Sequence, residues 1–330
     1  MKRKITIIGD GAWGTALAIL LARNNYKIYL WSPFPHYAKK MAEYRENKDF
    51  LPGFMLPDAI SVTSDPQEAM MAADAVVIAV PTKYTNKTLD LFRQYVLPSA
   101  KIISVSKGFD SETKLRLSEL IKQKFSLENI AALSGPSYAI EVAKGLPTAV
   151  TIASANHDFA VFFQKIFNCQ CFRVYTSQDI IGVELGGTLK NIIAIAAGVS
   201  DGLGFGDNTK AALITRGLAE ITRLGVALGA SPATFAGLSG MGDLILTCTG
   251  KLSRNRAFGE QIGKGAKAAD ILATTKNAIE GAWNCEIAKK LAEKANIEVP
   301  IITQVCNLIN GTTTPIEAVN MLLSRSAKPE

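Results

Sequence analysis

A short apolar strand, followed at once by a glycine-rich turn and a helix-forming stretch, constrains this chain more than any other feature. Residues 4–8, Lys-Ile-Thr-Ile-Ile, are β-branched and apolar, which predicts a buried strand. A G-x-G-x-x-G turn occupies residues 9–14, and residues 15–24 then favour a helix. Residues 28–31 predict a second strand, so the chain opens with one right-handed βαβ unit.

The spacing of the glycines in this turn indicates a dinucleotide site. Gly9 would make the tight turn, Gly11 would let the backbone approach a pyrophosphate, and Gly14 would allow the helix to pack closely on the strand. The start of the helix adds N–H donors and the positive end of the helix dipole. A glycine turn that binds nothing is the alternative, but the preceding strand and the following helix are the context that the motif requires.

The end of the second strand bears on the choice between NAD and NADP. Residues 30–34 read Leu-Trp-Ser-Pro-Phe, so the acid that would bind a ribose 2′-hydroxyl is missing there. No arginine stands there either, and the basic residues Lys39, Lys40 and Arg45 lie somewhat downstream. We therefore predict that both NADP and NAD are used, with a lean towards NADP.

Strands and helices alternate to about residue 178. Strands are predicted over residues 74–80, 101–105, 130–133, 149–153 and 172–175, with helices between several of them over 88–95, 115–125 and 159–167. Apolar strands that alternate with helices are typical of a mostly parallel sheet covered on both faces.

Beyond that point only helices are predicted, over residues 180–199, 210–228, 256–262, 280–295 and 315–323. A chain of 330 residues also exceeds what one hydrophobic core usually fills. We predict an α/β protein in which an N-terminal Rossmann-type doubly wound sheet, residues 1–185, binds the dinucleotide. An all-helical C-terminal domain, residues 186–330, would bind the substrate.

Composition excludes several classes of protein. Hydrophobic residues make up 48% and charged residues 20%, which indicates a globular chain. The net charge of +7 is dispersed, since no run of five or more basic residues occurs, and by itself it fits nucleic acid, a membrane surface or anionic small substrates. Five cysteines at irregular spacing and two histidines form no zinc pattern, so we predict no metal.

Membrane and export signals are weak as well. The longest apolar runs, residues 16–22 and 75–80, are far shorter than the roughly 20 residues of a spanning helix. The basic start, residues 1–4, is followed only by Ile-Thr-Ile-Ile before Gly9, a stretch too short for a signal-peptide core. We expect a cytoplasmic protein that is not integral to a membrane.

Candidate catalytic groups lie after strands and inside one helix. Lys107 follows the strand 101–105 and should lie at the carboxyl edge of the sheet, where open α/β folds bind ligands. Residues 134–137, Ser-Gly-Pro-Ser, follow the next strand and offer backbone N–H groups. Lys190 stands in an apolar helix, where burial would lower its pKa and suit a proton-transfer catalyst. Alternatively, its stem packs while its ammonium reaches water.

Two clusters follow in the second half. Residues 239–243, Ser-Gly-Met-Gly-Asp, form a predicted glycine loop that carries Asp243 into an apolar stretch. Residues 253–256, Ser-Arg-Asn-Arg, group a hydroxyl, an amide and guanidinium groups that can donate two parallel hydrogen bonds. This combination suits a phosphate clamp. The alternative is a solvated surface turn in which Ser253 or Asn255 caps the next helix.

Six motifs occur in one order, at residues 9–18, 106–108, 134–137, 186–191, 239–243 and 253–256. Together they resemble the bacterial NAD(P)-dependent sn-glycerol-3-phosphate dehydrogenases, over about residues 4 to 320. The resemblance implies an active site in the cleft between a Rossmann and a helical domain. It also implies reversible hydride transfer between NAD(P)H and dihydroxyacetone phosphate, giving sn-glycerol 3-phosphate for glycerophospholipid synthesis, and a homodimer.

The resemblance further implies roles for particular residues. Lys190 would be the proton donor or acceptor, Lys107 would add positive charge, and Asp243 would orient the amines. Substrate contacts are implied for Lys107, Gly135, Ser137, Lys190, Asn191, Asp243, Ser253, Arg254 and Asn255. Dinucleotide contacts are implied for Gly9, Gly11, Ala12, Trp13, Gly14, Pro33, Lys107, Ala139, Arg254, Ala278 and Glu280.

Two positions depart from the family pattern, and two other classes of protein stay open. Ala12 stands where many members have serine, and Pro33 stands where some carry the histidine or arginine that would face a 2′-phosphate. A related reductase of a hydroxyacid or of ketopantoate would not need the 253–256 clamp. A dinucleotide sensor or a basic nucleic-acid-binding protein would leave Lys107, Lys190 and Asp243 without a role.

Overall fold

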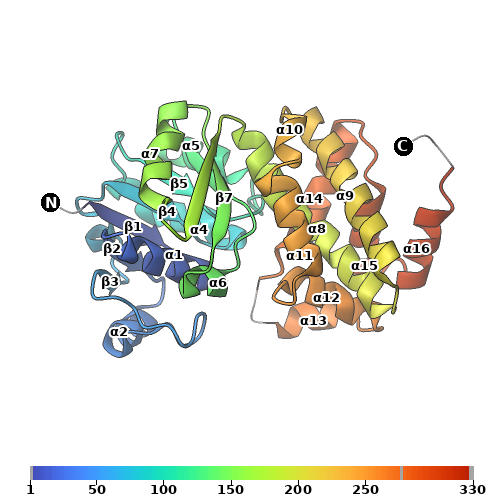
Figure 1. Ribbon diagram of the computed structural model, residues 1–330, viewed down its shortest axis with the longest axis horizontal. Helices are drawn as coiled ribbons and strands as arrows, with labels where there is room; N and C mark the ends of the chain where they lie inside the picture. Colours follow the sequence, from blue (N-terminus) through green and yellow to red (C-terminus); the bar gives the residue numbers. More distant parts are fainter. Residues whose placement is uncertain (1–2, 276–277, 327–330) are drawn as a thin grey trace. The chain divides into compact units, whose positions relative to one another are not determined.

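The chain forms two compact units in the computed structural model, which describes residues 3–275 and 278–326. The first unit, Met1–Glu184, contains a sheet with helices, and the second, Leu185–Glu330, is helical in its described residues (Figure 1). The helix α8 (Ile180–Gly202) begins in the first unit and continues into the second. Glu184 belongs to the first unit because its carboxylate accepts hydrogen bonds from Arg116 and Ser118.

The sheet of the first unit has eight strands in the order β3-β2-β1-β4-β5-β6-β7-β8. Their bounds are β1 Lys4–Ile8, β2 Lys27–Trp31, β3 Ile60–Thr63, β4 Ala75–Ile78, β5 Ile102–Ser104, β6 Ala131–Ser134, β7 Thr148–Ala153 and β8 Phe172–Ser177. All neighbouring pairs are parallel except β6 and β7. The order of the first six strands is that of a doubly wound dinucleotide-binding sheet, which confirms the predicted fold class.

Alternating side chains build a core on each face of this sheet. Ile5 and Ile7 of β1 face one cluster, which includes side chains of α1 (Ala12–Arg23), α6 (Ala139–Lys144) and α7 (His157–Phe167). Ile8 of β1 faces the other cluster, with α3 (Pro66–Met70), α4 (Thr82–Phe92) and α5 (Leu117–Phe125). Because successive side chains of a strand point to opposite faces, a fully apolar strand serves both cores.

One strand and several helices are absent from the sequence prediction. The strand β3 has only four residues, and two of them are half-buried, so its apolar signal is weak. The helix α2 (Pro35–Tyr44) begins at a proline and buries only Ala38 and Met41, a pattern too sparse to identify it. In the second unit, the predicted glycine loop at 239–243 is instead a π-helical turn, Leu238–Gly242, that leads directly into a helix.

The second unit is a set of helices around α8. They are α9 Asp207–Ala227, α10 Pro232–Phe235, α11 Asp243–Thr249, α12 Arg254–Gly263, α13 Ala268–Thr274, α14 Glu280–Lys294, α15 Pro300–Ile309 and α16 Pro315–Leu323.

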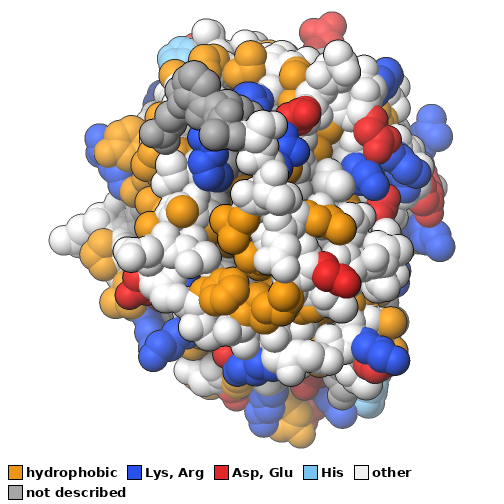
Figure 2. Space-filling view, turned by 90° about the vertical axis from the view of Figure 1, so that its right-hand side faces the viewer, with side chains coloured by type: hydrophobic (Ala, Val, Ile, Leu, Met, Phe, Trp, Pro, Cys, Tyr) orange, Lys and Arg blue, Asp and Glu red, His pale blue; other side chains and the backbone are white. Residues whose placement is uncertain are grey.

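With 23 residues, α8 is long and apolar enough to cross a membrane by length and composition alone, yet 78% of its most apolar window is buried. Such burial is also what the core helix of a globular domain shows. On the face shown in Figure 2, hydrophobic groups lie among polar ones, and basic and acidic groups are interspersed.

Close glycine contacts join α8 to α12. A Cβ atom on Gly198 would lie 1.9 Å from the carbonyl oxygen of Arg256, and one on Gly259 would lie 2.0 Å from that of Ile195. Only glycine permits this backbone approach, which brings the start of α12 close to the middle of α8.

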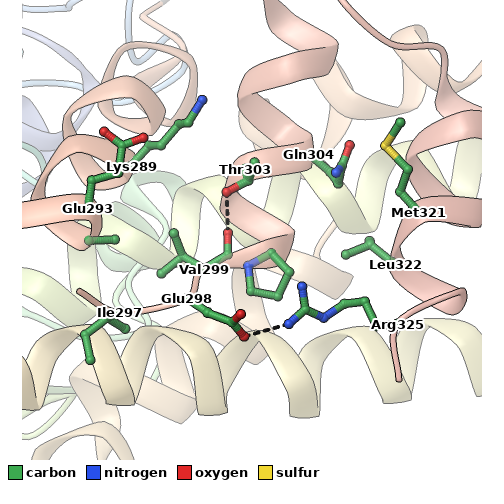
Figure 3. Close-up of a pocket in the computed structure, with 12 residues that line it drawn as sticks. Lys289, Glu293, Ile297, Glu298, Val299, Thr303, Gln304, Met321, Leu322 and Arg325 are labelled. Atoms are coloured by element: carbon green, nitrogen blue, oxygen red, sulfur yellow. Dashed lines mark hydrogen bonds and ion pairs between the residues drawn. The ribbon is translucent and has the colours of Figure 1, made fainter. Parts of the chain in front are cut away.

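A buried carboxylate fixes the start of α15. Glu220 of α9 is 1% exposed and accepts hydrogen bonds from the backbone N–H groups of Ile301 (2.9 Å) and Ile302 (2.8 Å). The end of α14, the start of α15 and the end of α16 line an open hollow of about 250 Å³, where Arg325 pairs with Glu298 at 2.6 Å (Figure 3). Burial raises the pKa of Glu220 to about 7, against the hydrogen bonds and the nearby arginines.

This shift makes stability depend on pH. Because the folded pKa of Glu220 is raised above the unfolded value, the folded state holds a proton that the unfolded state releases between about pH 4.5 and 7. Stability from this group should therefore be present at low pH and fall by about 2 kcal/mol from pH 5.5 to 8. Urea unfolding of the wild type and of Glu220→Gln at both pH values measures the difference. A gap between the two proteins that stays constant with pH would contradict the assignment.

Candidate active site

The fingerprint turn has the backbone that a dinucleotide requires. Gly9 has φ +116°, and a Cβ there would lie 2.7 Å from the carbonyl oxygen of Ala79. A Cβ on Gly14 would lie 2.0 Å from the carbonyl oxygen of Gly9, so this contact also demands glycine. A Cβ on Gly11, by contrast, would meet nothing within 4 Å. The helix α1 begins at Ala12 without a side-chain cap, so the open space at Gly11 fits a pyrophosphate at a helix N-terminus.

Residues after β5 and β6 meet around one carbonyl group. Lys107 Nζ donates to the Gly135 carbonyl oxygen at 2.9 Å, and Ser137 Oγ donates to the same oxygen at 2.9 Å. Trp13 Nε1 donates to the Val105 carbonyl oxygen at 3.2 Å, which ties the fingerprint helix to the end of β5. The structure therefore brings Lys107, Gly135 and Ser137 together. The indole of Trp13 contacts the residue that directly follows β5.

Ala12, Pro33 and Ala139, three of the predicted cofactor positions, carry no polar side chain. Ala12 and Ala139 are half-buried and pack against the core on the α1 face. Pro33 is exposed, two residues beyond the end of β2. Any contact of these residues with a dinucleotide would be apolar or through the backbone.

An acid does lie near the end of β2, but it comes from the fingerprint turn. Asp10 is 6% exposed, burial raises its pKa, and its carboxylate is hydrogen-bonded to Ser32, the residue that follows β2. Its Oδ2 atom is buried without a hydrogen-bond partner. This acid was not predicted, because the fingerprint pattern places the ribose-binding acid at the end of the second strand. The signal was available as a charged residue between two fingerprint glycines.

Asn47 ties the segment after α2 to the same turn. Its side-chain amide donates to the Asp10 carbonyl oxygen at 2.6 Å and to Thr15 Oγ1 at 2.7 Å. Its side-chain oxygen accepts from the Tyr37 hydroxyl at 2.6 Å. Asn47 is fully buried, so this hydrogen-bond network holds the backbone of the fingerprint turn in place.

In the second unit, a buried ion pair lies at the centre of α8. Lys190 Nζ donates to Asp243 Oδ1 at 2.6 Å and to Thr247 Oγ1 at 2.7 Å. Lys190 is 6% exposed and Asp243 is 1% exposed, so the alternative of an ammonium that reaches water is wrong. Thr247 was not predicted, although it lies four residues after Asp243 and so on the same face of α11. The pair holds the ammonium in one orientation.

The start of α12 joins this cluster through two amides. Asn255 Nδ2 donates to Asn191 Oδ1 at 3.0 Å, and Asn255 Oδ1 accepts from the Gly281 N–H at 2.9 Å. Ser253 is the N-cap of α12, since its hydroxyl accepts from the N–H of Arg256. The N-cap prediction is confirmed, but a solvated surface turn is wrong, because Ser253 and Asn255 are buried.

Arg254 differs from these neighbours because its side chain is exposed. It occupies the first residue of α12, where backbone N–H groups point away from the helix. The carboxylate of Glu280, at the start of α14, acts on it electrostatically, and Ala278 is half-buried two residues before Glu280. A guanidinium at a helix N-terminus is an arrangement that binds a phosphate group.

A doubly wound sheet with an intact fingerprint turn, together with a helical unit that buries a lysine–aspartate pair, defines an NAD(P)-dependent oxidoreductase. The chain belongs to the NAD-dependent glycerol-3-phosphate dehydrogenase family. The family model for the N-terminus matches residues 4–160, and that for the C-terminus matches residues 179–320.

Named relatives cover the whole chain. It is 47% identical over 333 residues to glycerol-3-phosphate dehydrogenase [NAD(P)+] of Geobacter sp. (strain M21), covering 100% of this chain and 99% of the relative. It is 46% identical to the protein of the same name from Geobacillus thermodenitrificans, covering 99% and 96%. The crystal structure of glycerol-3-phosphate dehydrogenase from Coxiella burnetii superposes with a TM-score of 0.94 at 38% identity, covering 98% and 99%.

Proposed function

We propose that this chain catalyses reversible hydride transfer between NAD(P)H and dihydroxyacetone phosphate, giving sn-glycerol 3-phosphate for glycerophospholipid synthesis. The observation that carries the proposal is the buried Lys190–Asp243 pair in a chain of this family. A cytoplasmic location and a homodimer, as expected for the family, are parts of the same proposal.

The first unit binds the dinucleotide. The N–H groups at the start of α1 donate hydrogen bonds to the pyrophosphate, which lies in the open space at Gly11, and Trp13 is held by its hydrogen bond to the Val105 carbonyl oxygen. When bound, the nicotinamide supplies a hydride in reduction and accepts one in oxidation. Lys107, held by the Gly135 carbonyl group, adds positive charge where a phosphorylated anion binds.

The second unit handles the proton. As the carbonyl carbon of the substrate is reduced, negative charge develops on its oxygen, and the Lys190 ammonium donates a hydrogen bond and then the proton. In the oxidation direction the neutral amine accepts the hydroxyl proton. Asp243 and Thr247 orient the amine throughout, so its rotamer is fixed before the substrate binds.

The start of α12 holds the substrate phosphate. Arg254 supplies a fork of donors, the helix N-terminus supplies backbone N–H groups, and Ser253 and Asn255 line the site. Asn191 contributes by holding Asn255, and Lys190 stands next to Asn191 on α8. This clamp favours a phosphorylated substrate over a hydroxyacid, because a phosphate group offers three terminal oxygens and up to two negative charges to these donors, whereas a carboxylate offers two oxygens and one charge.

The decisive assay is oxidation of NADPH and of NADH by the purified protein on addition of dihydroxyacetone phosphate, with unphosphorylated dihydroxyacetone as the control. We expect rapid turnover with the phosphorylated ketone alone. Turnover with ketopantoate or a 2-ketoacid instead would favour the related reductases. Cofactor binding without any turnover, or salt-dependent binding to DNA or RNA, would favour the sensor or nucleic-acid class.

Asp10 should influence the choice of cofactor. Its carboxylate lies by Ser32 at the end of β2, where this fold places the adenosine ribose, so it disfavours the negative 2′-phosphate of NADP. In Asp10→Asn the Kd for NADPH should fall by about tenfold relative to that for NADH, since a unit charge at such sites contributes about 1 kcal/mol or more. Fluorescence titration measures both Kd values. Asp49→Asn removes an exposed charge that acts on Asp10 and serves as the control. An unchanged ratio in Asp10→Asn would exclude this role.

A further inference from the structure

Two cysteines that the proposed reaction does not use face each other in the first unit. Cys169 Sγ and Cys171 Sγ lie 3.6 Å apart, and both thiols are free. They occupy the tight turn between α7 and β8, which is closed by two backbone hydrogen bonds between Cys169 and Phe172, at 3.0 and 3.2 Å. The turn therefore sets the distance between the two sulfur atoms.

The surroundings of this pair allow a small reagent to reach it. Both side chains are half-buried against the core on the α1 face, and Gln170 between them is exposed. Closing a bond requires the sulfur atoms to approach from 3.6 Å to about 2.05 Å, which side-chain rotation within an exposed turn can supply. The geometry is thus that of a dithiol one step from a disulfide.

We propose that Cys169 and Cys171 are a redox modification site, at which a low-molecular-weight disulfide converts the two thiols to an intramolecular disulfide. One thiolate attacks the small disulfide and displaces one thiol, giving a mixed disulfide. The second cysteine then attacks its neighbour's sulfur and displaces the other thiol. The protein loses two electrons and two protons, and the small disulfide is reduced to two thiols.

Both cysteines are reduced in this structure. Burial, together with the neighbouring Cys169 thiol, raises the pKa of Cys171, so its thiol keeps its proton at neutral pH. Oxidation closes a small ring within the turn that precedes β8. The preceding residues, Ile166 and Phe167, accept hydrogen bonds from Asn24 at the end of α1, so the site adjoins the C-terminal end of that helix.

The chain contains a matched control. Cys285 of α14 and Cys306 of α15 also lie within hydrogen-bond reach of each other, and that contact together with burial raises the pKa of Cys306. Both are essentially inaccessible, with exposures of 1% and 0%. A reagent whose reaction requires access to the sulfur atoms should therefore oxidise Cys169 and Cys171 but not Cys285 and Cys306 in the folded protein.

Peptide mapping tests the proposal directly. The reduced full-length protein is incubated with oxidised glutathione, alkylated with N-ethylmaleimide and digested with trypsin, which releases residues 166–173 with both cysteines in one peptide. We expect this peptide to lose two thiol hydrogens, to escape alkylation and to recover both thiols with dithiothreitol, while Cys285 and Cys306 stay reduced. Cys169→Ser should instead carry a stable glutathione adduct on Cys171.

Other results would overturn the proposal. They are full alkylation of both cysteines after oxidation, a stable glutathione adduct in the wild type, or oxidation of the 166–173 peptide only when the protein is unfolded in urea. Because the readout is a peptide mass, it does not depend on turnover, and failure of the proposed dehydrogenase activity would leave it interpretable.

Discussion

Replacing Lys190 with alanine should lower kcat for dihydroxyacetone phosphate reduction by about 10²- to 10⁴-fold, the usual contribution of a positioned general acid. The physical reason is that the substrate oxygen gains negative charge in the transition state and loses the ammonium that would neutralise it. The Kd for NADH should change little, since the fingerprint turn belongs to the other unit. Steady-state kinetics and fluorescence titration on the same preparation measure both quantities.

Two controls separate catalysis from folding in this experiment. Lys210→Ala also removes a lysine paired with an aspartate in the second unit, at 2.7 Å from Asp201, and should keep nearly full activity. Added alkylamines should restore part of the activity of Lys190→Ala, because a small ammonium can occupy the vacated space and donate the proton. Since the variant leaves Asp243 buried without its partner, urea unfolding must show a folded protein at the assay temperature. Near-normal kcat in a folded Lys190→Ala would disprove the assignment.

Replacing Arg254 with alanine should raise KM for dihydroxyacetone phosphate by about 10- to 100-fold, the equivalent of one or two hydrogen bonds between charged groups. In the proposed mechanism the guanidinium at the start of α12 binds the phosphate and proton transfer depends on Lys190, so kcat should fall less than kcat/KM. Unphosphorylated dihydroxyacetone should be reduced equally slowly by the wild type and the variant.

Arg256 provides the matched control for the clamp. It lies two residues further along α12, but its guanidinium donates to Asp201 at 2.6 Å and lies 3.7 Å from Glu260. Arg256→Ala removes the same charge from the same helix and should leave KM almost unchanged. Equal increases in KM for both variants would point to a general effect of charge and would exclude a specific clamp at Arg254.

Much of the fold could be predicted from local patterns. The apolar residues 4–8, the G-x-G-x-x-G turn and the following helix carry their signals within a few neighbours, and all three appear as β1, the turn and α1. The elements that were missed, β3 and α2, bury few side chains and depend on the sheet beside them. The loop predicted at 239–243 is wrong for a similar reason, because its helical turn depends on tertiary contacts. Gly240 packs against the backbone of Phe235, and Gly186 packs against that of Ser239.

The candidate site divides in the same way. The residue types and the order of the motifs indicated Lys107, Lys190, Asp243 and Arg254. Charged residues within apolar or glycine-rich motifs can be recognised from the sequence alone. The functional assignments of these residues remain predictions for the experiments above, and the boundary of the two domains at residues 185 and 186 also stays a prediction.

Hydrophobic periodicity and short motifs are enough to predict the doubly wound sheet, the helical second half and the kind of chemistry. Which groups meet in space can be seen only in the folded chain. Folding places Thr247 on Lys190, Asp10 beside Ser32, and Cys169 against Cys171. These contacts depend on how helices and turns pack, down to glycine positions such as Gly198 and Gly259 where backbones touch, and packing is set by the whole chain at once.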